Sequence, residues 1–64
     1  MRVKYNGKCD LLHGIWEVHA IVPNGETHPD TLSVNNSGRN EYICFRGGPR
    51  YTFNEDEIEV VPES

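Results

Sequence analysis

The sequence predicts an all-β domain, built as a small barrel of five or six short antiparallel strands with a 3₁₀ turn before the last strand. Three observations predict it. Short segments alternate polar and apolar residues, turn signals recur roughly every eight to twelve residues, and the whole chain has 64 residues. A two-sheet sandwich is too large for this length, whereas a strongly bent barrel pairs its own strand edges. We therefore expect one domain covering residues 1–64.

Residues 15–22 have the clearest strand pattern. Five of these eight residues are β-branched or aromatic, which favours a strand over a helix. The even-numbered residues Trp16, Val18, Ala20 and Val22 are all apolar, whereas the odd-numbered positions mix apolar and polar residues. The segment is therefore predicted to turn one face towards the core.

Five further segments have the composition of short strands, because they alternate polar and apolar residues or are rich in aromatic and β-branched ones. They are Arg2–Tyr5, residues 31–34, Glu41–Phe45, residues 50–53 and Ile58–Val61. Residues 35–38 predict a hairpin turn, since Asn and Gly tolerate the positive φ of tight hairpins. Residues 54–57 predict a single helical or 3₁₀ turn with Asn54 as its cap.

The predicted core consists of the apolar side chains on the inward face of each strand. Trp16 and Phe53 are expected to contribute most of the buried area, because large aromatic side chains dominate small cores. The predicted core residues are Val3, Tyr5, Trp16, Val18, Ala20, Leu32, Val34, Ile43, Phe45, Phe53, Ile58 and Val60.

Composition limits the classes of function. Hydrophobic residues make up 36% of the chain and charged residues 25%, and the net charge is −4. Proteins that neutralise phosphates usually have a basic balance, so the charge disfavours nucleic acid as a partner. No segment approaches the roughly 20 apolar residues of a membrane helix, and the chain begins without an apolar signal region. We therefore expect a cytoplasmic protein with reduced cysteines.

Several segments resemble a family of small SH3-like proteins common in bacterial and bacteriophage genomes. The resemblance rests on Arg2–Tyr5, residues 11–18 and residues 51–61, which together make up a little over a third of the chain. Connections at residues 26–30 and 47–49 look longer than those usual in the family. The resemblance implies an SH3-like barrel and a bacteriophage or accessory context. Because most members of the family have no assigned function, it implies no particular activity.

The side chains with catalytic or metal-binding chemistry do not form a recognisable pattern. Cys9, His13, His19, His28 and Cys44 are possible zinc ligands, but only Cys9 and His13 have ligand-like spacing and a second pair is missing. A Cys–His nucleophile would need a lowered thiol pKa and a third orienting residue, and the spacing indicates neither. We therefore expect no enzyme, no catalytic residue, no metal and no cofactor.

An acidic cluster lies near the end of the chain. Glu55, Asp56, Glu57 and Glu59 are close together, followed by Glu63. One interpretation is a solvated turn and a charged edge that discourages strand pairing. The other is an electrostatic docking surface for a basic partner.

The leading hypothesis is a non-catalytic protein-interaction module, such as a phage or prophage accessory protein that modulates a host protein. Two alternatives remain open: a small nucleic-acid-binding barrel that uses the region from Arg39 to Arg50, and a self-associating structural protein that pairs strand Glu41–Phe45 with a second copy. The candidate partner-binding residues combine aromatic, arginine and acidic side chains. They are Tyr42, Arg46, Arg50, Tyr51, Glu55, Asp56 and Glu57.

Overall fold

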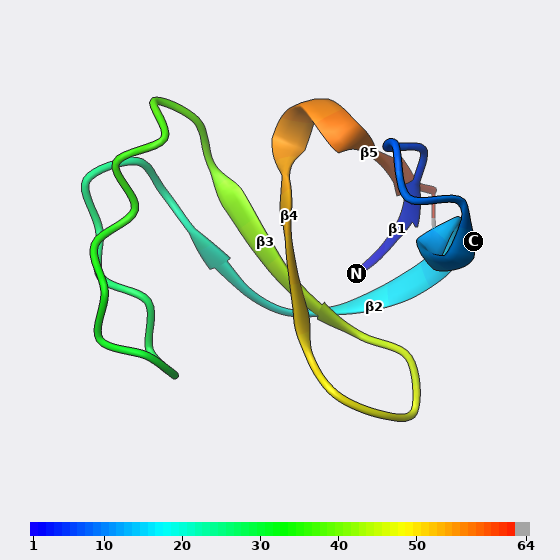
Figure 1. The fold of residues 1–64 in the computed structure, drawn as a ribbon, viewed down its shortest axis with the longest axis horizontal. Coiled ribbons are helices and arrows are strands. Elements are labelled where there is room, and N and C mark those ends of the chain that lie inside the picture. The colour runs from blue at the N-terminus through cyan, green and yellow to red at the C-terminus, as the bar shows by residue number, and fades with distance from the viewer. Residues whose placement is uncertain (63–64) are drawn as a thin grey trace.

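Five antiparallel strands form one sheet in the computed structural model, which describes residues 1–62 (Figure 1). The elements follow in the order β1 (Arg2–Tyr5), the 3₁₀ turn η1 (Asp10–Leu12), β2 (Gly14–Val22), β3 (Glu41–Phe45), β4 (Tyr51–Asn54), the 3₁₀ turn η2 (Glu55–Glu57) and β5 (Ile58–Val61). The strand order is β4-β3-β2-β1-β5. The all-β prediction and the 3₁₀ turn before the last strand are confirmed. Among residues 1–62, no helix is long and apolar enough to cross a membrane.

The sheet is open. β4 and β5 stand at opposite ends of the strand order, and η2 joins them along the chain. Two backbone hydrogen bonds hold η2 in place: the Asn6 N–H donates to the Glu57 carbonyl at 2.7 Å, and the Glu55 N–H donates to the Asn40 carbonyl at 3.1 Å. The end of β4 and the start of β5 are therefore joined by a turn, and the two strands do not pair with each other.

The central position of β3 overturns one expectation. β3 lies between β2 and β4 and pairs with both, so its backbone groups are already used. The prediction that strand Glu41–Phe45 pairs with a second copy is therefore wrong. Within residues 1–62, the free sheet edges belong to β4 and β5.

The long strand β2 is shared between the two halves of the sheet. Its first residues pair with β1, and its later residues pair with β3, with a register shift between Val18 and Ala20. Val18 lies opposite Cys44, but Ala20 lies opposite Ile43. Because adjacent residues of β3 face opposite sides, this bulge moves the apolar row of β2 to the other face of β3. Both faces of β3 are consequently covered, and Ile43 and Cys44 are both buried.

The main core lies on the concave face of the curved sheet and is rich in aromatic side chains. Trp16, only 3% exposed, packs edge-on against Phe53 with 5.2 Å between ring centroids, and Phe53 stacks on Tyr5 at 4.4 Å. The cluster consists of Val3, Tyr5, Trp16, Cys44 and Phe53, with Leu12, Val18, Tyr42 and Ile58 packed against it. The inward placement of Trp16 and Val18 is confirmed.

Four predicted core residues are exposed instead: Leu32, Val34, Phe45 and Val60. Leu32 is the most exposed, at 78%, because residues 31–34 form no strand and make only a single bridge, between Thr27 and Val34. Phe45 follows the buried Cys44 and faces the other side of the sheet. Val60 sits on the edge strand β5, so no further strand covers it.

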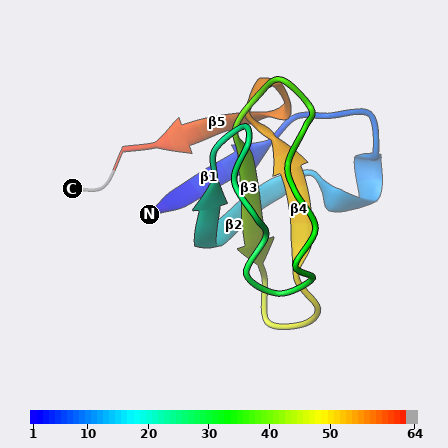
Figure 2. The same cartoon turned by 90° about the vertical axis from the view of Figure 1, so that its left-hand side faces the viewer.

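The β2–β3 connection, residues 23–40, replaces the predicted strand and hairpin turn. It leaves the end of β2, extends beside the sheet and returns to the start of β3, on the left in Figure 1 and towards the viewer in Figure 2. The buried Asn35 organises it: its Nδ2 donates to the carbonyls of Val22 at 2.8 Å and Arg39 at 2.7 Å, and its Oδ1 accepts from the Ser37 N–H at 3.1 Å. The asparagine that predicted a hairpin turn therefore closes this connection through its side chain.

A hydrogen-bonded His–Glu pair and an ion pair attach the connection to the sheet. His28 Nε2 lies 2.7 Å from Glu41 Oε1 on β3, and Arg50 Nη1 lies 3.0 Å from Asp30 Oδ2. The first pair is mostly buried, whereas the second is partly exposed and contributes less. Both contacts hold residues 28–30 against the strands that follow.

Replacing Asn35 by alanine is expected to lower the free energy of unfolding by about 2 kcal/mol, because the carbonyls of Val22 and Arg39 lose the hydrogen bonds from Asn35 Nδ2. Urea denaturation followed by tryptophan fluorescence measures this loss. The control is Asn36→Ala at the exposed neighbouring position, which should change stability by less than about 0.5 kcal/mol. Equal effects of the two substitutions would contradict the role of Asn35.

Candidate functional site

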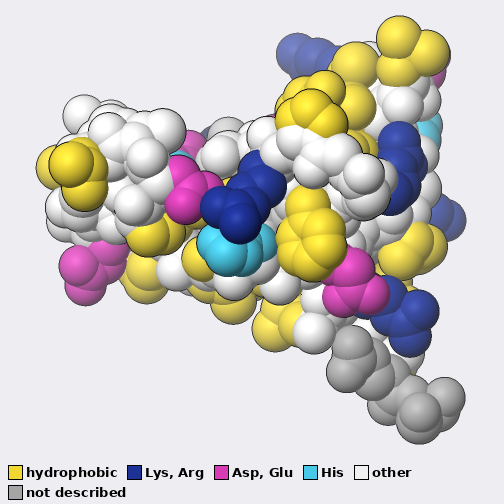
Figure 3. All heavy atoms as spheres, turned by 90° about the horizontal axis from the view of Figure 1, so that it is seen from below, with side chains coloured by type: hydrophobic (Ala, Val, Ile, Leu, Met, Phe, Trp, Pro, Cys, Tyr) yellow, Lys and Arg dark blue, Asp and Glu magenta, His cyan; other side chains and the backbone are white. Residues whose placement is uncertain are grey.

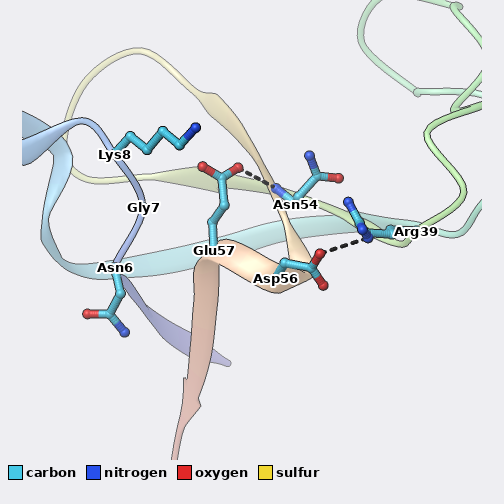
Figure 4. A pocket seen from close by; sticks show the side chains of 7 residues that line it. All are labelled: Asn6, Gly7, Lys8, Arg39, Asn54, Asp56 and Glu57. Carbon is cyan, nitrogen blue, oxygen red and sulfur yellow. Dashed lines mark hydrogen bonds and ion pairs between the residues drawn. The ribbon is translucent and has the colours of Figure 1, made fainter.

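A polar hollow of about 560 Å³ lies where three separate chain segments meet (Figure 4). The loop after β1 contributes one wall, the end of the β2–β3 connection another, and η2 with the last residue of β4 the third. Its lining residues are Asn6, Gly7, Lys8, Arg39, Asn54, Asp56 and Glu57. The hollow therefore depends on tertiary structure, since its walls come from distant parts of the sequence.

Glu57 is a carboxylate of the hollow with two hydrogen-bond partners. Its Oε1 accepts from the Asn54 backbone N–H at 3.3 Å, and its Oε2 accepts from the Tyr5 hydroxyl at 3.3 Å. The first contact is part of a capping box, in which the side chain of the third residue of the turn accepts from the backbone N–H of the capping residue. Since a carboxylate accepts about four hydrogen bonds and both contacts are long, Glu57 retains acceptor capacity towards the hollow.

An ion pair joins two walls of the hollow. Arg39 Nε lies 2.7 Å from Asp56 Oδ2, and both side chains are about half exposed. An exposed pair of this kind contributes little stability, so its main effect is to set the position of two charged groups at the rim. In Figure 4 the Lys8 side chain extends over the Glu57 side of the hollow, whereas the Asn6 amide points away from it.

A second surface lies at the junction of η1 with the β3–β4 loop. The Arg46 guanidinium stacks over the Trp16 ring at 4.3 Å, and it donates to the carbonyls of His13 at 3.1 Å and Leu11 at 3.5 Å. Tyr51 packs edge-on against the same indole with 5.4 Å between centroids. Gly14, at φ +122°, lets the chain leave η1 so that Arg46 reaches these carbonyls, because side-chain-bearing residues rarely adopt this conformation.

The predicted partner-binding residues divide between these two places. Asp56 and Glu57 line the hollow, and Arg46 and Tyr51 form the second surface. The other three predicted residues lie outside both: Tyr42 is half-buried against the core, Arg50 pairs with Asp30, and Glu55 is exposed beside the hollow. Of the acidic cluster, Glu63 lies outside the described residues.

Sequence reasoning missed Asn6, Gly7 and Lys8 as wall residues of the hollow and Leu11 at the second surface. The turn signal at Asn6-Gly7 marked the loop, but nothing in the sequence indicated that η2 packs beside it. The sequence predicts Arg39 as a contact for nucleic acid or in a protein hot spot, but does not place it in the wall of this hollow.

The arginines considered for nucleic-acid binding do not form one basic face. Arg39 and Arg50 each pair with an aspartate, and Arg46 lies apart from them, where it donates to backbone carbonyls. In Figure 3, Lys and Arg side chains on the face shown are separated by acidic and hydrophobic ones. Nucleic-acid binding therefore stays a prediction that this geometry does not favour.

The candidate metal and nucleophile residues are also dispersed. Cys9 is exposed and Cys44 is buried, and both are free thiols. Burial raises the pKa of the Cys44 thiol from 9.0 to about 11, so this thiol is protonated near neutral pH and is a poor nucleophile. Within residues 1–62, no three His, Cys, Asp or Glu side chains are grouped to hold a metal ion.

Comparison with protein-family models, with curated proteins and with solved structures found no match.

Gly7→Ala is expected to destabilise the protein by about 1–3 kcal/mol. A Cβ at this position would collide with the Tyr5 hydroxyl and the Glu57 carboxylate, which hold the loop against η2. Thermal and urea denaturation measure the effect. Gly48→Ala is the matched control, because an added Cβ there meets no atom within 4 Å. If Gly7→Ala leaves the stability unchanged, the close approach of this loop to Tyr5 and Glu57 is not required.

The Cys44 thiol is expected to make stability fall in alkaline solution. Because its pKa is raised from 9.0 to about 11 on folding, the contribution is complete below pH 9 and is lost as pH rises to about 11. Across this window the free energy of unfolding should fall by about 1–3 kcal/mol more in the wild type than in Cys44→Ala. Urea titrations at each pH measure the slope. The exposed-thiol variant Cys9→Ala should follow the wild type, and parallel slopes for all three proteins would contradict the assignment.

Proposed function

We propose that this protein is a non-catalytic protein-interaction module that binds an extended polypeptide segment in the polar hollow. The observation that carries the proposal is the hollow itself, whose volume of about 560 Å³ is within the range of ligand sites. Its lining combines a hydrogen-bond donor with an acceptor: Lys8 only donates, and the Glu57 carboxylate only accepts. This mixture suits the alternating N–H and C=O groups of an extended chain.

The hollow is largely open to solvent, which favours a polypeptide over a small apolar ligand. Charged and amide side chains line the hollow, but their aliphatic stems supply at least as much of its surface as their polar ends, which suits a polypeptide with both polar and apolar groups. Its walls are loops and a turn carried by a curved sheet, which is how binding residues are commonly presented. The protonated Cys44 lies in the core and outside the lining of the hollow, which supports a role in binding rather than catalysis.

The proposal includes an SH3-like fold, as a barrel left partly open. Supporting features are the opening strand β1, the aromatic strand β4, the short turn η2 and the last strand β5, in the order typical of the small bacterial and bacteriophage SH3-like proteins that the sequence resembles. A phage or prophage accessory protein in the host cytoplasm, acting by stoichiometric binding to a host protein, is the role that this likeness supports.

Selection from a library of random linear peptides displayed on phage tests the proposed site. Peptides enriched on the immobilised protein should lose at least about fivefold in affinity towards Glu57→Gln, because the hollow loses its best-placed acceptor charge. Isothermal titration calorimetry measures each affinity. Glu59→Gln is the matched control, since it makes the same change of charge on an exposed residue of β5 outside the hollow.

Amide chemical shifts locate the bound peptide. Residues 6–8 and 54–57 should shift most strongly when a selected peptide is added to ¹⁵N-labelled protein. The proposal fails if no peptide is enriched above background. It also fails if enriched peptides bind both variants as well as the wild type.

A further inference from the structure

Arg46 differs from the other two arginines in its segment of the chain. Arg39 and Arg50 are each neutralised by an aspartate, at 2.7 Å and 3.0 Å. Among residues 1–62, Arg46 has no such carboxylate partner, and the Trp16 ring and two backbone carbonyls hold it. The guanidinium is thus fixed in position while its charge is not neutralised by an acid.

The surroundings of Arg46 are apolar and open to solvent. Leu11, whose carbonyl accepts from Arg46, is 89% exposed, and Tyr51 is 42% exposed while its ring contacts Trp16. We call this surface the Arg46 platform, formed by Leu11, Arg46 and Tyr51 around the buried Trp16 ring. Tyr and Arg on a well-packed base are the residue types that contribute most to protein–protein binding.

The chemistry of the platform selects its ligand. A guanidinium has five N–H donors, and the carbonyls of His13 and Leu11 use two of them. The remaining donors are suited to a planar carboxylate. Because stacking on Trp16 already restricts the side chain, little conformational entropy is lost when an acid binds.

We infer that the Arg46 platform is a second interaction surface, which binds a partner polypeptide at an acidic side chain flanked by apolar residues. The unpaired guanidinium provides the charge complementarity, and Leu11 and Tyr51 cover the apolar neighbours. A protein partner is favoured over nucleic acid because the one arginine of the platform contacts few phosphates, whereas the exposed Leu11 and Tyr51 add apolar contacts. This surface is separate from the hollow, so the inference stands or falls independently of the proposed function.

The test compares two blocked tripeptides on the full chain, acetyl-Leu-Glu-Leu-amide and its neutral isostere acetyl-Leu-Gln-Leu-amide. ¹⁵N-labelled protein is titrated at low salt, and shifts of Arg46 Nε–Hε, the Trp16 indole N–H and the Tyr51 amide are followed. The glutamate peptide should bind at least about threefold more tightly than the glutamine peptide, and added salt should reduce the difference. This comparison uses wild-type protein and does not depend on the folding of any variant.

Variants then assign the binding to the platform. Leu11→Ser should weaken the glutamate peptide about two- to threefold, whereas Leu32→Ser, at a similarly exposed leucine on the β2–β3 connection, should have no effect. Arg46→Gln should abolish the preference for glutamate over glutamine, and Arg50→Gln should preserve it.

Three results would overturn the inference. The first is equal affinity for the glutamate and glutamine peptides. The second is a set of shifts that avoids Leu11, Arg46 and Tyr51. The third is a single-stranded oligonucleotide or inorganic phosphate that shifts Arg46 when the glutamate peptide does not, which would make the platform a phosphate-binding surface.

Discussion

Burial of the Trp16 indole is the constraint on which the rest of the structure depends. The ring lies on the long strand β2 and contacts Phe53 of β4, while its N–H donates to the Leu12 carbonyl of η1 at 2.7 Å. Arg46 covers it from the β3–β4 loop at 4.3 Å. A domain of this size buries only roughly 60% of its unfolded surface, so one large side chain that connects four elements accounts for much of its core.

The bulge in β2 allows so short a chain to cover both sides of its central strand. By shifting the register between Val18 and Ala20, it directs the first half of β2 to the main core and the second half to the β2–β3 connection. The connection then buries Val22 and Asn35. Without the bulge, the apolar row of β2 would stay on one face of β3, and Ile43 would lack its neighbours.

The two candidate surfaces differ in how their charges are used. In the hollow, Arg39 and Asp56 neutralise each other, and Glu57 is engaged by Tyr5 and a backbone N–H. At the Arg46 platform, the cation is fixed by stacking and by carbonyl groups, so its charge is not neutralised by an acid. The hollow is therefore suited to the polar backbone of a ligand, and the platform to one acidic side chain.

Local sequence determined five of the six predicted strands, the inward face of the first half of β2 and the turn before β5, because alternation and turn residues act over a few neighbours. Arg2–Tyr5, Glu41–Phe45 and Ile58–Val61 have the predicted bounds, and Trp16 is buried as expected. Tertiary structure alone decided that Asn35 closes a connection rather than a hairpin, that Leu32 is exposed, and that Lys8, Arg39 and Glu57 surround one hollow. These outcomes depend on contacts between residues far apart in the chain, whose free energies no local pattern encodes.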